Sequence, residues 1–490
     1  MKRLYRRFSR RTVLGTLGAQ PLLGIEWLTC PAKAQAPDPL QDWLAANVKP
    51  VRTVDPQNED FSDLEPLAAA IGTARVVQLG EPSHNAGTCF SAKVRLIKFL
   101  HERLNFDVVI WESGIYDVEL VEAGMRAGEN PVAAARRGIL QNWSWSQDCR
   151  PLFAYAGASH ATVRPLVMAG FDSSLTSPFA NLADKLRDYA GKPASMALRR
   201  EATATTEELI QAFTGLTRYV EGLDTINASL TTTGGAARQE ALARWERETG
   251  AALRPNRGML ERFQAAQLKL AEMLRDNENE FARIDGARQS GFMRRVVDSL
   301  SARGVNLYER FGTDFTPSTD GGLAEQNRRD ASNSENLRWL IEQGYPGRKV
   351  IVWAHNAHVM NAYYDAPDFK TVRLAPATNT MKPHGVFLAE WLGRDLYTIG
   401  FTAYEGEDGW THMATVPAIA PARAASIEAR LLKLGHPFAF LDLRGAAGVL
   451  RGTQTMRVPK YDEVELTDVT RPYDGIFFIA RMGRATLIPS

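Results

Sequence analysis

The sequence predicts an α/β fold in which a mainly parallel sheet is flanked by helices and carries a large all-helical insertion. Two observations predict the sheet: short apolar runs alternate with amphipathic stretches, and several runs end in Glu, Asp or His. A third predicts the insertion, because residues 180–310 are rich in Ala, Leu, Arg and Glu and lack strand signals.

The clearest strand–helix–strand unit begins at Arg75. Residues 76–79 and 107–111 are apolar runs with the length and composition of buried strands. Between them, residues 90–104 repeat apolar side chains at helical spacing, which predicts an amphipathic helix. Two strands joined by a helix form a βαβ unit, and such units build parallel sheets.

Polar side chains follow these runs at the positions where a parallel sheet binds its ligands. Glu81 and His84 come just after the first run, and Glu112 follows the second. A later apolar run that ends in Trp leads into His355 and His358. Because ligands bind beyond the carboxyl ends of parallel strands, we expect these five side chains to share one polar site.

The domain boundaries follow from where the strand signals stop and resume. Residues 60–179 and 311–490 carry the strands and predict the α/β domain, and residues 180–310 form the helical insertion. Residues 35–59 are rich in Pro, Asp and Asn, which predicts a linker with a short helix. An apolar run in the first part ends in Asp172, so we expect this acid at the same sheet edge.

The first 34 residues resemble a twin-arginine export signal. Residues 9–15 read Ser-Arg-Arg-Thr-Val-Leu-Gly, an apolar stretch follows, and residues 32–34 offer an Ala-Lys-Ala cleavage site. A disordered basic tail is the alternative. The signal predicts a periplasmic or secreted protein with the twin-arginine machinery as a partner. No stretch is long and apolar enough to predict stable membrane insertion.

Composition and charge narrow the class of protein. The 490 residues are 44% hydrophobic and 23% charged, which is typical of a soluble enzyme. A net charge of +2 argues against a nucleic-acid binder. After cleavage only Cys89 and Cys149 would remain. Although the periplasm permits a disulfide, twin-arginine substrates fold in a reducing cytoplasm, so we expect two separate buried thiols.

Two chemistries suit a group of His and Glu side chains. In the first, a carboxylate orients a His that takes a proton from water, and the water attacks an ester. In the second, the side chains bind a divalent metal that supplies hydroxide. A serine hydrolase is disfavoured because the chain has no Gly-x-Ser-x-Gly elbow, and we interpret Ser83 as a loop or cap hydroxyl.

These residues resemble the erythromycin esterase family. The motifs are Gly-Glu-Pro-Ser-His at residues 80–84, the run ending in Glu112, Trp-Ala-His-Asn-Ala-His at residues 353–358, and the closing segment 473–479. The resemblance spans roughly residues 58–480 and is weakest in the helical insertion. It implies a hydrolase of an ester or lactone small molecule, with macrolides, and hence antibiotic resistance, among the candidates; together with the signal at residues 1–34 the expectation is an exported hydrolase.

The resemblance also implies roles for individual residues. His84 matches the general base, which activates water without a covalent enzyme intermediate, and no cofactor is required. The family's other catalytic positions are matched by Glu81, Glu112, His355 and His358. Lys93 matches a position that is commonly Arg. Because Lys cannot make the planar bidentate contact of Arg, we expect a different substrate geometry.

Further expectations concern substrate binding. Trp143 and Trp145 fall where the family has aromatic residues, and we expect them to wall the substrate, with ordinary core packing as the alternative. Asp172 is expected to line the same site. Two other functions stay open: a metal-dependent hydrolase of the same fold, and a non-catalytic periplasmic protein in which His355 and His358 bind haem or a metal.

Overall fold

The structure, a computed structural model, describes residues 38–488 except 231–234, 316–321, 366–370, 374, 378, 414 and 447. The expected export signal at residues 1–34 lies outside the described residues. Among the residues that are described, no helix has the length and apolar character needed to cross a membrane.

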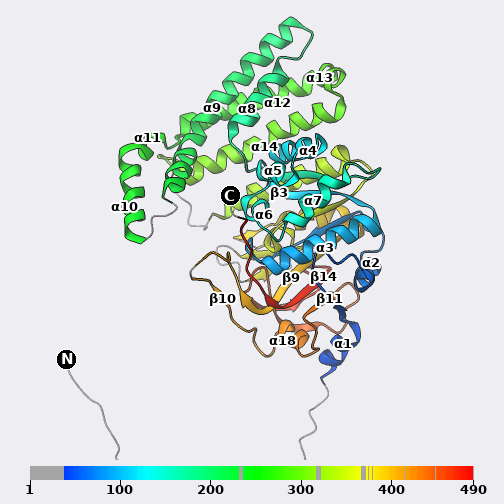
Figure 1. Ribbon diagram of the computed structural model, residues 1–490. Coiled ribbons are helices and arrows are strands. Elements are labelled where there is room, and N and C mark those ends of the chain that lie inside the picture. Colours follow the sequence, from blue (N-terminus) through cyan, green and yellow to red (C-terminus); the bar gives the residue numbers. More distant parts are fainter. Residues whose placement is uncertain are drawn as a thin grey trace, which may run out of the picture. The chain divides into compact units, whose positions relative to one another are not determined.

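A central sheet organises the fold (Figure 1). In spatial order its strands are β1 (Lys49–Val51), β11 (Phe438–Asp442), β14 (Gly475–Met482), β9 (Leu396–Glu407), β2 (Val76–Leu79), β5 (Lys349–Trp353), β3 (Phe106–Gly114) and β4 (Val167–Asp172), with β10 (Ala418–Ile419) beside β9. The strands from β14 to β4 run parallel. The pairs β1–β11, β11–β14 and β9–β10 are antiparallel.

Helices cover the sheet and extend beyond it (Figure 1). Those before the helical region are α1 (Pro39–Asn47), η1 (Ser62–Leu64), α2 (Glu65–Ile71), α3 (Gly87–Leu104), α4 (Ile115–Arg126), α5 (Pro131–Arg136), α6 (Gln141–Ser144) and α7 (Arg150–Ser159). The helical region contains α8 (Phe179–Ala190), α9 (Met196–Ser229), α10 (Gly235–Trp245), η2 (Glu246–Gly250), α11 (Ala251–Leu253), α12 (Arg257–Asp276), α13 (Glu278–Asp285), α14 (Ala287–Phe311), α15 (Leu323–Trp339) and η3 (Leu340–Gly344).

The last part of the chain adds short elements. Its helices are α16 (Asn356–Val359), α17 (His384–Leu392), η4 (Gly393–Asp395) and α18 (Ile427–Leu432). Two small sheets contain β6 (Tyr363–Asp365), β7 (Val372–Arg373), β8 (Thr380–Met381), β12 (Arg451–Arg457) and β13 (Glu463–Asp468).

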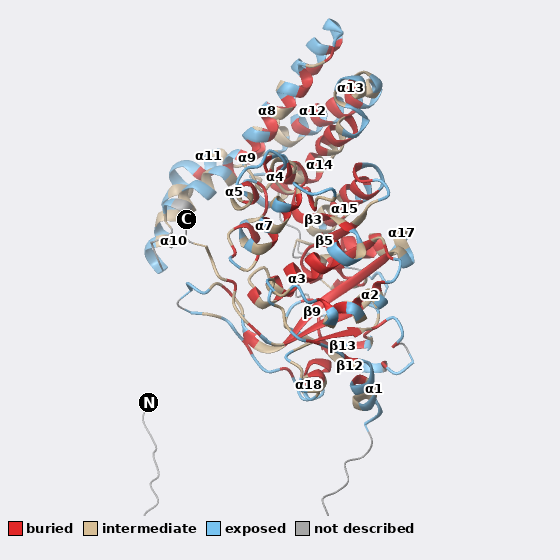
Figure 2. Ribbon diagram, turned by 45° about the vertical axis from the view of Figure 1, so that its right-hand side comes forward, coloured by how far each residue is buried: buried red, intermediate tan, exposed pale blue. Residues whose placement is uncertain are grey.

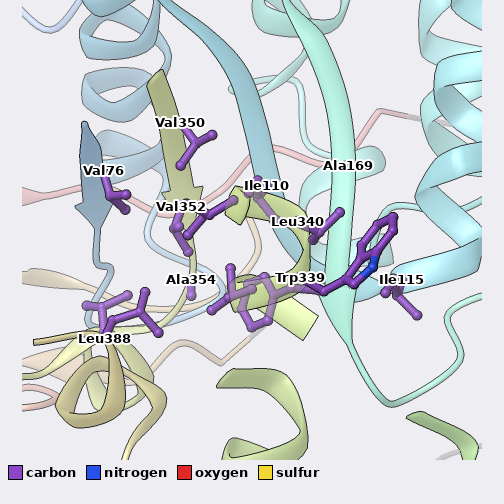
Figure 3. Close-up of a cluster of buried hydrophobic side chains, with 14 of the residues drawn as sticks. Val76, Ile110, Ile115, Ala169, Trp339, Leu340, Val350, Val352, Ala354 and Leu388 are labelled. Carbon is purple, nitrogen blue, oxygen red and sulfur yellow. The ribbon is translucent and has the colours of Figure 1, made fainter. Parts of the chain in front are cut away.

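Both faces of the central strands are buried, as Figure 2 shows by colour. Alternate residues point to opposite faces. Val76, Val350 and Val352 belong to the core of one face, where Trp339 and Leu340 pack near them (Figure 3). The other face has its own core, to which α3 contributes. Burial on both faces explains the near-continuous apolar runs of these strands.

The predicted fold class is confirmed: a mainly parallel sheet is flanked by helices, and a large helical region lies between β4 and β5. The helical region is held together by apolar faces that meet at helical spacing. The rings of Phe213 on α9 and Phe263 on α12, for example, are 5.2 Å apart and fully buried.

The expected linker at residues 35–59 contains a short helix, as the sequence predicts, but it also forms a strand that the sequence did not predict. From Pro39 this stretch forms α1, whose Leu44 is fully buried, and then β1, in which Val51 registers with Phe438 of β11. These residues therefore add a strand to the edge of the sheet. Local Pro and Asp content does not report such pairing, because the partner strand lies almost 400 residues away in the sequence.

Candidate active site

Parallel pairing brings the predicted strand ends together. Leu79 of β2 and Trp111 of β3 both register with Trp353 of the central strand β5. β2 and β5 therefore end side by side, whereas β3 continues past this level to Gly114 and contains Glu112. Glu81 and Glu112 consequently lie at one edge of the sheet, as the sequence predicted.

The first group of the site is centred on Glu81, whose side chain is fully buried. Oε1 of Glu81 lies 2.7 Å from Nδ1 of His84 and accepts a hydrogen bond of 3.0 Å from Nε1 of Trp143. A carboxylate only accepts hydrogen bonds, so Nδ1 of His84 carries the hydrogen. The lone pair is therefore on Nε2, and the His84 side chain is 33% exposed.

Lys93 compensates the buried charge of Glu81. Its Nζ lies 2.8 Å from Oε2 of Glu81 and 3.9 Å from the ring centre of Trp353, and its side chain is fully buried. A carboxylate inside a protein is costly unless it is paired. Lys93, on α3, is thus paired with Glu81 inside the protein and does not reach the surface.

His355 braces the loop that carries His84. Its Nε2 lies 3.1 Å from the carbonyl oxygen of Pro82 and donates to it, whereas its Nδ1 accepts from the backbone N of Ala357 at 3.0 Å. Burial holds the pKa of His355 well below its usual value. The neutral ring meets His84 edge-on, with ring centres 5.2 Å apart. Both nitrogens are therefore already engaged with backbone.

The second group is centred on Arg329 of α15, which no sequence pattern singled out. Nη2 of Arg329 donates to Oε1 of Glu112 at 2.9 Å, and Nε donates to Oδ1 of Asp172 at 3.2 Å. Nη2 also bonds the other oxygen of Asp172. Oε2 of Glu112 accepts from the backbone N of His355 at 2.9 Å. Glu112 and Asp172 therefore clamp the guanidinium.

Charge keeps Glu112 ionised. Burial alone would raise the pKa of Glu112, but the nearby charges of His358 and Arg329 outweigh it and hold the pKa well below the usual range. The anionic form accepts hydrogen bonds at both oxygens, which is the arrangement observed.

His358 links Arg329 to a further acid. Its Nδ1 lies 2.9 Å and 3.0 Å from the two carboxylate oxygens of Asp330, and its Nε2 lies 3.1 Å from Nη1 of Arg329. The same Nε2 is 3.5 Å from Oε1 of Glu112. Burial favours a lower pKa for His358, but Asp330 and Glu112 outweigh it and raise the pKa overall.

His384 completes this group from the start of α17. Its backbone N donates to Oδ1 of Asp330 at 2.9 Å, and its Nδ1 lies 3.6 Å from the same oxygen. The rings of His358 and His384 are nearly parallel, at 8°, with centres 6.1 Å apart. Burial lowers the pKa of His384, so its ring is neutral.

The residues expected to bind substrate have other contacts. Trp143 is fully buried and packs on Trp111 and Trp353, with ring centres 5.8 Å and 6.2 Å away. Trp145 is half-buried beneath the guanidinium of Arg136, 4.2 Å from the ring centre. Trp143 therefore positions Glu81 and is core, the alternative interpretation of the sequence. Asp172 belongs to the clamp around Arg329.

The sequence analysis did not identify Arg329, Asp330 or His384 as site residues, because none of them follows a predicted strand. Arg329 and Asp330 lie in mid-helix, and His384 begins a helix after a stretch without strand signals. The sequence did contain one signal: an Arg-Arg-Asp run at residues 328–330, in the middle of a helix, comes before the strand that His355 and His358 follow. Charged runs on helices are usually solvated, however, so this pattern alone does not indicate a site.

Comparisons with known proteins agree with the fold. A sequence model of the family described as Erythromycin esterase matches residues 101–482. The putative hydrolase YbfO of Bacillus subtilis (strain 168) is 24% identical over 455 residues, which covers 91% of this chain and 92% of that protein. Erythromycin esterase type II of Escherichia coli is 22% identical over 395 residues, covering 75% of this chain and 77% of that protein.

A solved structure extends the likeness to three dimensions. A mutant of the erythromycin esterase EreC in its open conformation matches with a TM-score of 0.60 and 18% identity, covering 90% of this chain and 100% of that chain. This likeness concerns the fold. The family match spans most of the sequence and includes Glu112, His355 and His358. The chain therefore belongs to the erythromycin esterase family.

Proposed function

We propose that this protein hydrolyses a carboxylic ester or lactone by water that His84 activates. One observation carries the proposal: the buried carboxylate of Glu81 accepts a hydrogen bond from Nδ1 of His84, which leaves Nε2 as the basic nitrogen of a partly exposed ring. A positioned imidazole of this kind is the commonest general base in enzymes. Membership of the erythromycin esterase family supports the same reaction class.

Arg329 is the natural stabiliser of the developing oxyanion. A guanidinium has five N–H groups. Nε uses one on Asp172, Nη2 uses two on Asp172 and Glu112, and Nη1 uses one toward His358. One Nη1 hydrogen is left, and the side chain is 20% exposed. Because the clamp fixes the guanidinium in place, it can meet negative charge without reorganising.

His84 and Arg329 together are sufficient for each step of the proposed reaction. Nε2 of His84 takes a proton from water, and the resulting hydroxide attacks the ester carbonyl carbon. The carbonyl oxygen becomes an oxyanion that Arg329 stabilises. As the intermediate collapses, the C–O bond to the alcohol breaks and His84 returns its proton to the leaving oxygen. Glu81 stabilises the imidazolium between these two transfers.

The other nucleophilic side chains support direct attack by water. The Oγ of Ser83 accepts from the backbone N of Asn85 at 3.2 Å, the contact of a loop hydroxyl. Cys89 and Cys149 are buried free thiols, as expected from the sequence, and burial raises the pKa of both well above the usual value. Thiols in such surroundings are poor nucleophiles. We therefore propose a mechanism without a covalent enzyme intermediate.

The proposed substrates are small-molecule esters and lactones. Macrolides come first for testing, because erythromycin esterase type II of Escherichia coli is among the similar proteins. Of the basic residues, Lys93 is buried on Glu81, so recognition of the acyl group falls to Arg329. Lys93 stands where the family commonly has Arg, so this site has one guanidinium fewer. We therefore propose that the substrate binds in a different geometry.

The test compares the wild-type enzyme with His84→Ala on simple aryl esters, lactones and erythromycin. We expect kcat to fall by ~10²–10⁴-fold for the ester that is cleaved, the usual contribution of a general base. His412→Ala serves as the matched control, because His412 is exposed and outside the site. Intact-mass measurement during turnover should detect no acyl-enzyme. Wild-type-like kcat in His84→Ala would exclude His84 as the base.

We also propose that the protein is exported through the twin-arginine route and acts in the periplasm or outside the cell. The support is the Arg10-Arg11 pattern with its apolar stretch and cleavage site. A reporter fused to residues 1–40 should reach the periplasm. Changing both residues, Arg10→Lys and Arg11→Lys, should block export, and unchanged export would remove this part of the proposal.

A further inference from the structure

His384 is a buried histidine that the proposed hydrolysis does not use. Its side chain is fully buried; within the described part of the chain its Nε2 has no hydrogen-bond partner, and its Nδ1 has only the long 3.6 Å contact with Oδ1 of Asp330. Buried polar nitrogens are normally paired, because burial removes their bonds to water. A buried ring with one unpartnered nitrogen and a second nitrogen in only a long contact therefore points to an absent partner.

The ring stands next to an acid that has no cation of its own. The charged-group contacts of Asp330 within the described residues are His358, at 2.9 Å, and His384, at 3.6 Å; no Lys or Arg pairs with it. A fully buried carboxylate requires a compensating positive charge.

The three side chains are spaced as a metal site requires. One donor atom from each of Asp330, His358 and His384 lies within 4.8 Å of the other two. In a tetrahedral Zn²⁺ site with bonds of about 2.0–2.2 Å, donor atoms are roughly 3.3–3.6 Å apart. The two nitrogen-to-carboxylate distances, 2.9 Å and 3.6 Å, lie close to that range. Small rotations of the three side chains would bring their donor atoms to the spacing of a zinc site.

We propose that Asp330, His358 and His384 form a site for a divalent transition-metal ion such as Zn²⁺. Two imidazoles and one carboxylate are a donor set that suits this class of ion and leaves one or more positions open. The three residues come from α15, α16 and α17, so the tertiary fold and not a local motif assembles the set. The His358 side chain is 12% exposed, so an ion from solvent would reach the site past this residue.

A surrounding acid is already in place to orient one ligand. Metal-binding histidines usually donate their second N–H to a carboxylate. Nε2 of His358 lies 3.5 Å from Oε1 of Glu112. Binding of a metal at Nδ1 places the ring hydrogen on Nε2, where it can bond to Glu112 in place of accepting from Arg329. The metal site would therefore share His358 and Glu112 with the hydrolytic site.

The test measures metal content, so it does not depend on ester hydrolysis. The full-length protein is stripped with a chelator and titrated with Zn²⁺ alone by calorimetry, and bound zinc is counted by elemental analysis after dialysis. We expect one Zn²⁺ per chain. His384→Phe keeps an aromatic ring of similar size next to Phe171, removes both nitrogens, and should weaken binding at least tenfold. His412→Ala should bind as the wild type does.

Substitution of cobalt provides a second measurement that needs no variant. Co²⁺ in the wild-type protein should give the visible ligand-field absorption of a low-symmetry nitrogen–oxygen site. Absence of stoichiometric zinc in the wild type, or equal binding by a folded His384→Phe protein, would overturn the inference. If hydrolysis is absent while zinc binds at these residues, the proposed function fails and this inference stands.

Discussion

Nδ1 of His84 and Oε1 of Glu81 lie 2.7 Å apart, and this contact decides which ring nitrogen is basic. The same oxygen accepts from Trp143, and the other oxygen of the carboxylate is held by Lys93. Glu81 is thus fixed by three donors in a fully buried position. Because Glu81 is held rigidly, the imidazole of His84 that bonds to it is also held in one orientation, as a general base requires.

Lys93→Met should destabilise the fold although Lys93 never reaches the surface. The change leaves the buried carboxylate of Glu81 without its cation, which typically costs roughly 3–5 kcal/mol. Urea unfolding followed by circular dichroism measures the loss. The double variant Glu81→Gln with Lys93→Met removes both charges and should recover much of the stability. Equal stability of wild type and Lys93→Met would show that the ion pair is dispensable.

Arg329→Lys should lower kcat by about 10²-fold, the loss expected for one oxyanion donor. Lys keeps the charge but cannot contact Asp172 and Glu112 through a planar fork. Arg328→Lys is the matched control, because Arg328 is the neighbouring residue on α15 and pairs with Glu309 instead. Steady-state kinetics of both variants on the same ester makes the comparison. A similar loss in both would assign the effect to helix stability.

Trp143→Phe should reduce kcat and leave KM nearly unchanged. The ring keeps its place in the core, but Glu81 loses the 3.0 Å hydrogen bond from the indole N–H. Hydrogen bonds to charged groups contribute about 1.5–3 kcal/mol, so the loss should loosen the carboxylate that orients His84. If KM rises while kcat is preserved, Trp143 contacts the substrate directly, contrary to its burial here.

Glu428→Gln should stabilise the protein at neutral pH. Burial raises the pKa of Glu428, whose Oε1 accepts from Thr402 at 2.8 Å and from the backbone of Arg457 at 2.9 Å. An acid with a raised pKa binds its proton more tightly when folded, so wild-type stability falls as pH rises above about 4.3, the ordinary Glu value. Gln carries no such penalty.

The pH dependence of stability tests the direction of the Glu428 pKa shift. Urea midpoints of wild type and Glu428→Gln should diverge as pH increases from acid to neutral and should coincide most closely at acid pH, where Glu428 is protonated in both states. A gap that is largest at acid pH would contradict the direction of the shift. Glu342→Gln, at a more exposed position, is the control.

The sequence by itself determined the sheet, its parallel strands and the position of the first acids and histidine. Hydrophobic periodicity locates buried strands, and the carboxyl ends of parallel strands meet at one edge, so the order of residues alone places Glu81, His84 and Glu112 together. The motifs around them also led to the family that the sequence match establishes. These features are local, or follow from general rules of sheet topology.

Only the tertiary structure decided which partners the site residues have. Arg329 contacts Glu112, which lies 217 positions away in the sequence, and it comes from a helix that no sequence pattern linked to the site. The sequence predicted a catalytic position for His355 and a substrate contact for Trp143, but their nitrogens bond to backbone and to Glu81. Periodicity reports which face of an element is buried; the partner of a buried polar atom depends on how distant elements pack, which no local pattern contains.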